Sequence, residues 1–372
     1  MSENARKIVE IMEMIAPSYL AETWDNVGLQ IGDLHKTIHK ILVCLEITDS
    51  IIDEAVSKKV DMIICHHPLL FQPVKAIRKD NPIGKMIHQL VRHDIVLYCA
   101  HTNLDIVLGG TNDILAQILN VRETKPLVSM NKEKYYKLCV YVPKPHVEEV
   151  RDALCSTDAG HIGNYSHCTF QIEGVGTFKP LEGTNPFIGT CGTVERVSEY
   201  KVETIVSGGN LNEAIENMQK AHPYEEVAYD VIPLKNDIVK YGLGRVGEFT
   251  EAIRLSLLCE EIKQKLGMKY IRFVGDANKQ IKKIGLCTGS GAEFIYDAYE
   301  AGCDCYITGD VKYHDAQYAT GLGIAVIDAG HFETENIMGR TLVQRLNKII
   351  EEKGFHVEVI LSNTCINPFQ TI

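Results

Sequence analysis

DMIICHHPLLF, at residues 61–71, begins with a short apolar run that ends at Cys65. Two histidines and a proline follow this run at once. A run of this length, bounded by turn residues, predicts a strand that is buried on both faces. Two similar runs lie at 41–47 and 95–100, and helical stretches around 49–59 and 83–93 separate the three. Buried strands that alternate with amphipathic helices predict a parallel sheet covered by helices on both faces.

The C-terminal part of the chain repeats this pattern. Apolar runs at 283–289, 305–310 and 324–330 predict three more strands. The expected helices are 294–301, 315–321 and 336–353, and a last strand is expected at 356–361. We therefore expect an α/β protein in which two similar halves, at opposite ends of the chain, form one unit.

The middle of the chain has a different order of elements. From about residue 134 the sequence predicts a strand, a helix, two strands, a helix and a strand. This is the order of a ferredoxin-like α+β domain. We expect such a domain at 129–235, inserted between an N-terminal α/β half at 1–128 and a C-terminal α/β half at 236–372.

Composition narrows the class of protein. The chain carries 38 Lys and Arg against 49 Asp and Glu, a formal net charge of −11. An acidic surface repels phosphate backbones, which disfavours general nucleic-acid binding, although a local basic groove stays open as an alternative. We expect a small-molecule substrate. No stretch reaches the ~18 apolar residues of a membrane span. The N-terminus lacks signal-peptide features and the 12 cysteines form no disulfide framework, so we expect a cytoplasmic protein.

Polar side chains follow three of the expected strands, where each strand ends. His66 and His67 follow one apolar run directly, Asp105 lies in CAHTNLD after the next, and His331 and Glu335 lie in DAGHFETE after a third. Open α/β sheets bind ligands beyond the carboxyl ends of their strands. Imidazoles with carboxylates suit Zn²⁺, Mn²⁺ or Fe²⁺, so we predict a site for one or two such ions. The alternative is that these histidines are ordinary hydrogen-bonding surface residues.

The spacing sets two conditions for that site. Adjacent residues on a strand point to opposite faces, so His66 and His67 share a site only if the strand has already turned. Pro68 favours such a turn, because it removes a backbone donor. His331 and Glu335 are four residues apart, so a helix there would place them on one face, one turn from each other.

Two further motifs are candidates for a supporting role. TGDVKYHDA, at 308–316, follows another expected strand, and we expect Asp310 and His314 to contact substrate or relay a proton. TWDNVGLQIG places Trp24 and Asp25 ahead of a glycine turn. The ordinary interpretation is a structural turn with Trp24 packed against a core, and the functional one is a wall of the site.

The expected insert contains AHPYEEVAYD, at 221–230. One interpretation gives His222, Glu225 and Glu226 a metal or small-ligand role, and the more ordinary one is a turn that ends a helix. The chain contains neither a GxSxG elbow nor a GxxxxGK[ST] loop, so nothing favours a serine hydrolase or a standard NTPase.

These motifs together resemble the Nif-three-like family, whose members are often labelled type II homologues of GTP cyclohydrolase I. WDNVGLQIG, ICHHPLLF, AHTNLD, GGTND, TGDVKYHDA and AGHFETE occur in the order and register of that family. The resemblance covers both end segments, about 1–128 and 240–372. AHPYEEVAYD resembles the PII-like or copper-tolerance-protein-like insert of long bacterial members.

The resemblance implies a site for two divalent metal ions per chain, with zinc first and manganese or iron as alternatives. It places the ligands on His66, His67, Asp105, His331 and Glu335, with Glu335 or Asp105 bridging. It also implies a ring-shaped homohexamer, with the sites facing an internal cavity and the insert lying over the openings.

The function that follows is a metal-dependent hydrolase acting on a nucleotide-like or other small phosphorylated compound, with a metal-activated water as nucleophile. If the cyclohydrolase label applies, that water attacks the imidazole carbon of guanine and opens the ring. The alternative is a non-catalytic regulatory or sensor protein, in which the PII-like insert senses a small ligand and the metals are structural.

Overall fold

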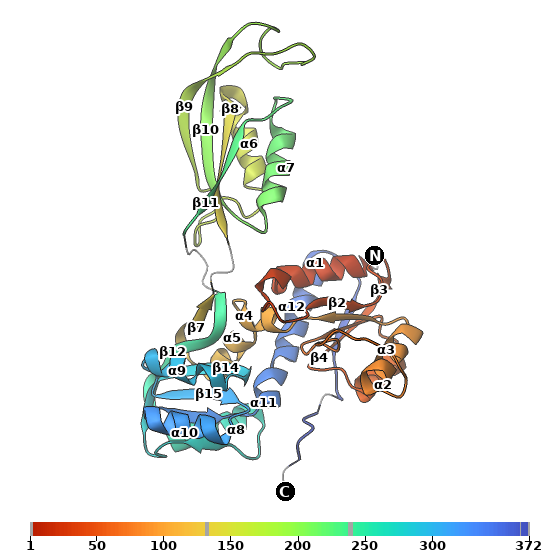
Figure 1. The fold of residues 1–372 in the computed structure, drawn as a ribbon, viewed down its shortest axis with the longest axis vertical. Coiled ribbons are helices and arrows are strands. Elements are labelled where there is room, and N and C mark those ends of the chain that lie inside the picture. Colours follow the sequence, from red (N-terminus) through yellow and green to blue (C-terminus); the bar gives the residue numbers. More distant parts are fainter. Residues whose placement is uncertain (1–2, 131–133, 237–240, 365, 371–372) are drawn as a thin grey trace. The chain divides into compact units, whose positions relative to one another are not determined.

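The computed structural model describes residues 3–130, 134–236, 241–364 and 366–370 (Figure 1). The chain divides into two compact units, of which unit 1 holds Met1–Met130 and Lys240–Ile372 and unit 2 holds Asn131–Val239. Unit 1 thus contains both end segments of the sequence, and unit 2 contains the middle. Within the described ranges, none of the helices is long and apolar enough to cross a membrane.

A five-stranded sheet forms one half of unit 1, in the order β17, β4, β5, β6, β2. Its strands are β2 (Gly28–Ile31), β4 (Lys40–Cys44), β5 (Met62–Cys65), β6 (Val96–Cys99) and β17 (Glu358–Leu361). The three central strands run parallel, which confirms the strands predicted at 41–47, 61–65 and 95–100. β17 extends the sheet parallel to β4, and β2 closes the other edge antiparallel to β6.

Helices bury both faces of this sheet. They are α1 (Ala5–Ile15), α2 (Asp49–Ser57), α3 (Pro82–Arg92) and α12 (Met338–Glu352). In β5, Met62 and Ile64 pack in the core with α1 and α12, whereas Ile63 and Cys65 pack in the core with α2 and α3. Alternate residues of a strand point to opposite faces, so an entirely apolar strand needs cover on both sides.

A six-stranded sheet forms the other half of unit 1, in the order β13, β16, β15, β14, β12, β7. Its strands are β7 (Arg122–Met130), β12 (Tyr241–Arg254), β13 (Arg272–Val274), β14 (Gln280–Ser290), β15 (Cys305–Gly309) and β16 (Ala325–Asp328). β14, β15 and β16 run parallel, as predicted. One core packs α5 (Thr111–Ile118) and α8 (Leu255–Leu266) on the sheet, and a second packs α9 (Ile295–Glu300) and α10 (Tyr313–Leu322).

The two sheets exchange strands. β7 comes from the N-terminal segment but pairs with β12 in the six-stranded sheet. The strand expected at 356–361 is β17, which comes from the C-terminal segment but pairs with β4, whose edge is otherwise open. The helix expected at 336–353 is α12, and a short helix, α11 (His331–Asn336), precedes it.

The smaller elements are β1 (Glu3–Asn4), β3 (Thr37–Ile38), α4 (Thr102–Ile106) and the 3-10 turns Ser18–Leu20 and Ala292–Phe294.

Unit 2 is a four-stranded antiparallel sheet in the order β11, β8, β10, β9, with α6 and α7 packed side by side in one core against it (Figure 1). Its elements are β8 (Tyr135–Pro143), the 3-10 turn Lys144–His146, α6 (Val147–Leu154), β9 (Thr169–Phe178), β10 (Glu195–Ser207), α7 (Leu211–Ala221) and β11 (Tyr229–Leu234). Strand, helix, two strands, helix and strand follow one another in the ferredoxin-like order that the sequence predicts.

The segments before and after unit 2 belong to neighbouring strands. Met130, at the end of β7, pairs with Tyr241, at the start of β12. An insertion is tolerated where its two ends lie close together. The chain between these two residues can therefore form a separate unit without interrupting the six-stranded sheet.

A buried arginine ties the N-terminal and C-terminal segments of the chain together within the six-stranded half of unit 1. Arg245 on β12 is 1% exposed, and its guanidinium donates two hydrogen bonds to the Asp113 carboxylate, at 2.6 and 2.8 Å. Its other N–H groups donate to the backbone carbonyls of Gly242, Gly244 and Val107. All five donors of the guanidinium are satisfied, so its buried charge is well compensated.

Replacing Arg245 by alanine is expected to destabilise the protein strongly, because the largely buried Asp113 carboxylate would keep its charge without a partner. We expect a loss of about 3–5 kcal/mol in the free energy of unfolding, measured by urea titration. The matched control is Arg254→Ala, at an exposed arginine of the same strand, which should change stability by about 0.5 kcal/mol or less. Equal stability of the two variants would contradict this role.

Glu54 on α2 attaches the C-terminal segment to the five-stranded half. Its carboxylate accepts hydrogen bonds from the hydroxyls of Ser362 and Thr364 and from the backbone N–H of Asn363, and it pairs with Lys58 at 2.6 Å. Burial raises the pKa of Glu54, but the Lys58 ammonium and these donors outweigh burial and lower the pKa to about 2.

The low pKa of Glu54 predicts a pH-dependent contribution to stability. Because the folded pKa lies below the ordinary value of 4.5, the contribution is present above that pH and is lost as the pH falls towards 2. Glu54→Gln should therefore lower the unfolding temperature at neutral pH, and the gap to the unchanged protein should narrow below about pH 5. Glu10→Gln, at an exposed site on α1, is the control and should give little gap. A gap that does not change with pH would contradict the prediction.

Candidate metal centre

The carboxyl ends of parallel strands in both sheets supply one cluster of side chains. His66 and His67 follow β5, Asp105 lies in α4 after β6, and His331 and Glu335 lie in α11 after β16. The structure brings these five side chains together. β5 ends at Cys65, so His66 and His67 both lie beyond the strand. Adjacent residues within a strand would point to opposite faces, so this position is the one that lets both side chains reach the same cluster. α11 places His331 and Glu335 one turn apart, as their spacing predicts.

One oxygen of Glu335 and one nitrogen from each of two histidines form a tight group. Its Oε2 lies 2.8 Å from Nε2 of His67 and 3.0 Å from Nε2 of His331, and the two Nε2 atoms are 3.4 Å apart. Zinc lies ~2.0–2.2 Å from nitrogen and oxygen ligands, which puts ligands of a tetrahedral ion about 3.4 Å from one another. The distance between the two nitrogens matches this spacing, the two nitrogen–oxygen distances are those of hydrogen bonds, and the group is compact enough to hold a metal ion.

The other oxygen of Glu335, Oε1, faces a second group that consists of His66 and Asp105. Nε2 of His66 lies 3.8 Å from Glu335 Oε1 and 3.6 Å from Asp105 Oδ1. His66 is fully buried, and its Nε2 has no hydrogen-bond partner among the described residues. A buried imidazole nitrogen without a partner is costly unless something else occupies its lone pair. The carboxylate of Glu335 thus lies between two groups of side chains, with His67 and His331 on one oxygen and His66 and Asp105 on the side of the other.

His101 is part of this cluster, although the sequence analysis did not include it among the ligands. Ring nitrogens of His66, His67 and His101 lie within 4.8 Å of one another, so these three also form a group that could hold a metal ion. The signal was present in the sequence: His101 stands just after β6, as His66 stands after β5. The orientation of His101 is set by its hydrogen bond to Asp25, which lies 76 residues away in the sequence. A local sequence pattern does not reveal a contact at this separation.

Three of the histidines are held by hydrogen bonds on the side away from the cluster. Nδ1 of His66 lies 2.8 Å from the Ala100 carbonyl oxygen, and Nδ1 of His331 lies 2.7 Å from Asp310 Oδ2. Nδ1 of His101 lies 2.9 Å from Asp25 Oδ1. These oxygens accept, so each Nδ1 donates its proton outward, and Nε2 is the nitrogen left to carry a proton or to bind a metal ion. Histidines that bind metals are commonly oriented in this way.

The charges of the cluster compensate one another. Burial lowers the pKa of His66, but the nearby carboxylates of Asp105 and Glu335 raise it to about 9. The hydrogen bond to Glu335 raises the pKa of His331 to about 9 as well. Burial raises the pKa of Glu335, but its contacts with His331, His66 and His67 outweigh burial and hold it well below the ordinary value. Divalent cations would supply the same positive charge that protons on these imidazoles supply.

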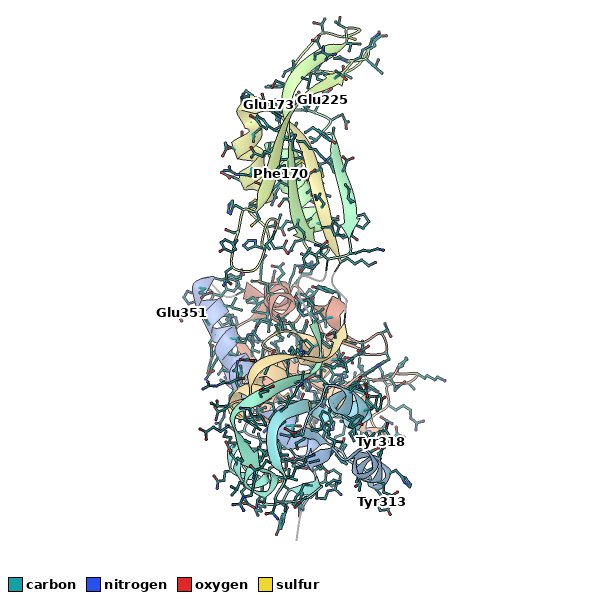
Figure 2. The ribbon with its side chains drawn as sticks, turned by 90° about the vertical axis from the view of Figure 1, so that its left-hand side faces the viewer. Phe170, Glu173, Glu225, Tyr313, Tyr318 and Glu351 are labelled. Carbon is teal, nitrogen blue, oxygen red and sulfur yellow. The ribbon has the colours of Figure 1, made fainter. Side chains whose placement is uncertain are left out.

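Of the two residues predicted to support the site, Asp310 contacts the cluster, whereas His314 is exposed on α10. The Asp310 carboxylate contacts His331, and its backbone lies in the left-handed region, at φ +55°. A non-glycine residue there is uncommon and often marks a functional position. His314 is exposed on α10 and its ring packs against Tyr313, which Figure 2 shows on the same helix. In the part of the chain that the structure describes, no hydrogen bond or ion pair joins His314 to the cluster.

Trp24 and Asp25 stand beside His101. Trp24 is 58% exposed and packs edge-on against Phe71 and His101, so it lies on the surface beside the cluster and not against a core. Of its two interpretations, this position agrees with the wall of the site. The buried Asp25 carboxylate accepts hydrogen bonds from the backbone N–H and hydroxyl of Thr102 as well as from His101. Burial raises the pKa of Asp25, but these donors lower it to about 2, so the residue stays charged.

A pocket of about 510 Å³ adjoins the cluster, with His67, His331 and Asp310 in its lining. Arg272 is the only Lys or Arg among the described lining residues, and Phe332 also contributes to the wall. A pocket of this size accommodates a small metabolite. The histidines at its edge place ligand-type nitrogens within reach of such a molecule.

Gly289, at the end of β14, gives Glu335 the room that it needs. A Cβ atom at residue 289 would lie 2.0 Å from Glu335 Oε1, and the backbone there has φ +66°. Both observations require glycine at this position.

Gly289→Ala should displace the Glu335 carboxylate and abolish tight binding of divalent metal, because the added methyl group would overlap Oε1. Gly267→Ala is the matched control: its φ is +70°, but nothing lies within 4 Å of the added atom. Both variants should lose ~1–2 kcal/mol of stability through backbone strain, and only Gly289→Ala should lose metal in titration calorimetry. Unchanged metal affinity in Gly289→Ala would contradict the assigned geometry.

Two joined α/β sheets with a histidine–carboxylate cluster at their strand ends define a class of candidate metalloprotein. The sequence profile of the family described as Duf34/NIF3 (NGG1p interacting factor 3) matches residues 3–368. The chain belongs to this family, which confirms the family that its motifs predicted. The likeness of unit 2 to PII-like proteins stays a prediction.

The chain is also similar over its whole length to individual members of the family. A Bacillus subtilis protein named GTP cyclohydrolase 1 type 2 homolog is 43% identical over 368 residues, covering 99% of this chain and 98% of that protein. A solved Bacillus cereus protein related to NIF3 matches with a TM-score of 0.94 at 40% identity, over 100% of both chains. A Staphylococcus aureus protein matches with a TM-score of 0.78 at 31% identity, over 100% of this chain and 99% of its own.

Proposed function

We propose that this chain is a metal-dependent hydrolase that uses two divalent cations, with zinc as the first candidate. The observation that carries the proposal is the Glu335 carboxylate, which is 4% exposed and turns one oxygen to His67 and His331 and the other to His66. A carboxylate that bridges two ions is a common arrangement in hydrolytic enzymes.

The distances suggest how the five ligands divide. His67, His331 and Glu335 Oε2 would hold one ion, and His66, Asp105 and Glu335 Oε1 would hold the other. When bound, such ions lower the pKa of a water and stabilise the negative charge that develops on the attacked centre. Thr111 donates a hydrogen bond to Asp105 and so fixes the orientation of that carboxylate.

His101 is placed to handle a proton beside the ligands. Its Nε2 has a free lone pair because Asp25 accepts the proton on Nδ1, and the charged Asp25 would stabilise the imidazolium that forms when His101 takes up a proton. The Asp310 carboxylate would orient His331. His314 would act only on a part of the substrate that reaches α10.

The pocket beside the cluster suits a small phosphorylated or nucleotide-like substrate. Arg272 is the one guanidinium of the described lining, but it pairs with Asp328, and the carboxylates of Glu46, Asp310 and Glu333 also line the pocket. A phosphate group would therefore depend on the bound metal ions for opposite charge, and the Phe332 and Phe369 side chains would provide apolar wall for a base. The relatives' name would make the substrate a guanine nucleotide, with water attacking the imidazole carbon of the base. The ring-shaped hexamer implied by the resemblance stays a prediction that light scattering tests.

The proposal is tested by metal content and turnover together. Protein loaded with Zn²⁺ or Mn²⁺ should bind about two ions per chain and hydrolyse one member of a panel of nucleotides and phosphoesters. Glu335→Gln should lose both ions and all turnover. Glu333→Gln, on the same helix, should keep both ions. Two tightly held ions without turnover on any compound would favour the regulatory alternative.

His101→Gln separates catalysis from metal binding. Because His101 is placed as a proton acceptor and not as a ligand, this variant should keep both ions but lose turnover by about a hundredfold or more. Loss of one ion in His101→Gln would contradict that role and make His101 a ligand.

A further inference from the structure

Unit 2 contains a pocket of its own, of about 390 Å³. Strands β8, β9 and β10, the loop at 180–188 and the AHPYEE turn after α7 supply its lining. Pro180, Pro186 and Ile188 make part of the wall apolar. Neither the metal centre nor the proposed hydrolysis involves this pocket.

Aromatic rings form a second part of the wall. The Tyr224 ring lies 5.8 Å from that of Phe178 and 6.3 Å from that of Phe187, and both arrangements are edge-on or tilted. Tyr141 lines the pocket as well. The faces of such rings carry partial negative charge and attract cations, most strongly where water is excluded.

A buried carboxylate adds full negative charge to this wall. Glu199 on β10 is 7% exposed, and its Oε1 accepts a hydrogen bond from the Tyr224 hydroxyl at 2.9 Å. No Lys or Arg of the described residues forms an ion pair with Glu199. Gly176, on the neighbouring strand β9, leaves the space that the carboxylate occupies, because a Cβ atom there would lie 1.9 Å from Glu199 Oε2. A buried carboxylate that has a hydroxyl donor but no positively charged partner is costly, and a bound cation would reduce that cost.

Two further acidic residues increase the negative potential. Glu225 and Glu226 also line the pocket, and Glu225 accepts hydrogen bonds from the backbone N–H of Asn185 in the facing loop. Figure 2 shows Glu225 near one end of the sheet of unit 2. No Lys or Arg occurs among the described residues that line the pocket, so a phosphate or carboxylate ligand would meet only repulsion there.

His222 holds the pocket in shape. Its Nε2 donates a hydrogen bond to the Tyr141 carbonyl oxygen at 3.0 Å, and its Nδ1 accepts one from the backbone N–H of Tyr224 at 3.1 Å. Burial lowers the pKa of His222, which agrees with this neutral state. Both ring nitrogens are therefore occupied, and His222 positions Tyr224 without a lone pair to offer a metal ion.

We propose that unit 2 binds a small organic cation, an alkylammonium or quaternary ammonium compound, between the rings of Tyr224, Phe178 and Phe187 and the carboxylate of Glu199. Rings supply the apolar contact and the cation–π attraction, and Glu199 supplies the opposite charge. The site adds a binding function to the chain that does not depend on the metal centre.

The test compares cations with uncharged compounds of the same shape on the full-length protein. Titration calorimetry should show choline binding at least about tenfold more tightly than 3,3-dimethyl-1-butanol, or 2-phenylethylamine more tightly than 2-phenylethanol by the same factor. Glu199→Gln keeps the acceptor for Tyr224 but removes the charge, and should weaken binding of the cation about tenfold. Phe187→Leu, at a half-exposed position, should weaken it severalfold without loss of folding.

Glu173→Gln is the matched control, because Glu173 lies on β9 but outside the pocket, and it should leave binding unchanged. Equal binding of the charged and uncharged compounds, or binding of neither cation, would overturn the proposal. Preferential binding of ATP at this pocket would overturn it as well.

Discussion

The candidate metal centre of unit 1 depends on one buried group, the Glu335 carboxylate. This carboxylate lies between imidazoles from distant parts of the chain. Nε2 of His67 and Nε2 of His331 lie 2.8 and 3.0 Å from one of its oxygens, and Nε2 of His66 lies 3.8 Å from the other. A carboxylate that is 4% exposed would ordinarily be neutral. It stays charged only because positive charge is close on both sides, whether that charge is carried by protons or by metal ions.

The fold of unit 1 keeps these groups in register. His66 and His67 follow a strand of the five-stranded sheet, whereas Glu335 follows a strand of the six-stranded sheet. Exchange of β7 and β17 makes each sheet incomplete without chain from the other half, and the Arg245–Asp113 pair holds α5 against β12 within the six-stranded half. A shift of a few tenths of an ångström between the sheets would change the distances at Glu335, so this bracing serves the site directly.

Much of this arrangement could be predicted from the sequence, because apolar runs such as 61–65 fix the strands and the residues after them fix the candidate site. His66 and Glu335 were expected to meet for that reason, although their role as ligands stays a proposal. The pairing of β17 with β4 could not be predicted, since periodicity shows that a strand exists but not which edge accepts it. The sequence left two interpretations of Trp24 open, packing against a core and a wall of the site, and the residue lies on the surface beside the site.

The most direct test of the account is the position of bound metal. Crystals of the full-length protein soaked in Zn²⁺ should show two anomalous-scattering peaks at the zinc absorption edge, one on each side of the Glu335 carboxylate and about 3.5–4 Å apart. One peak would coordinate His67 and His331, and the other would coordinate His66 and Asp105. Peaks elsewhere in the protein, with Glu335 contacting only histidine side chains, would contradict the central claim.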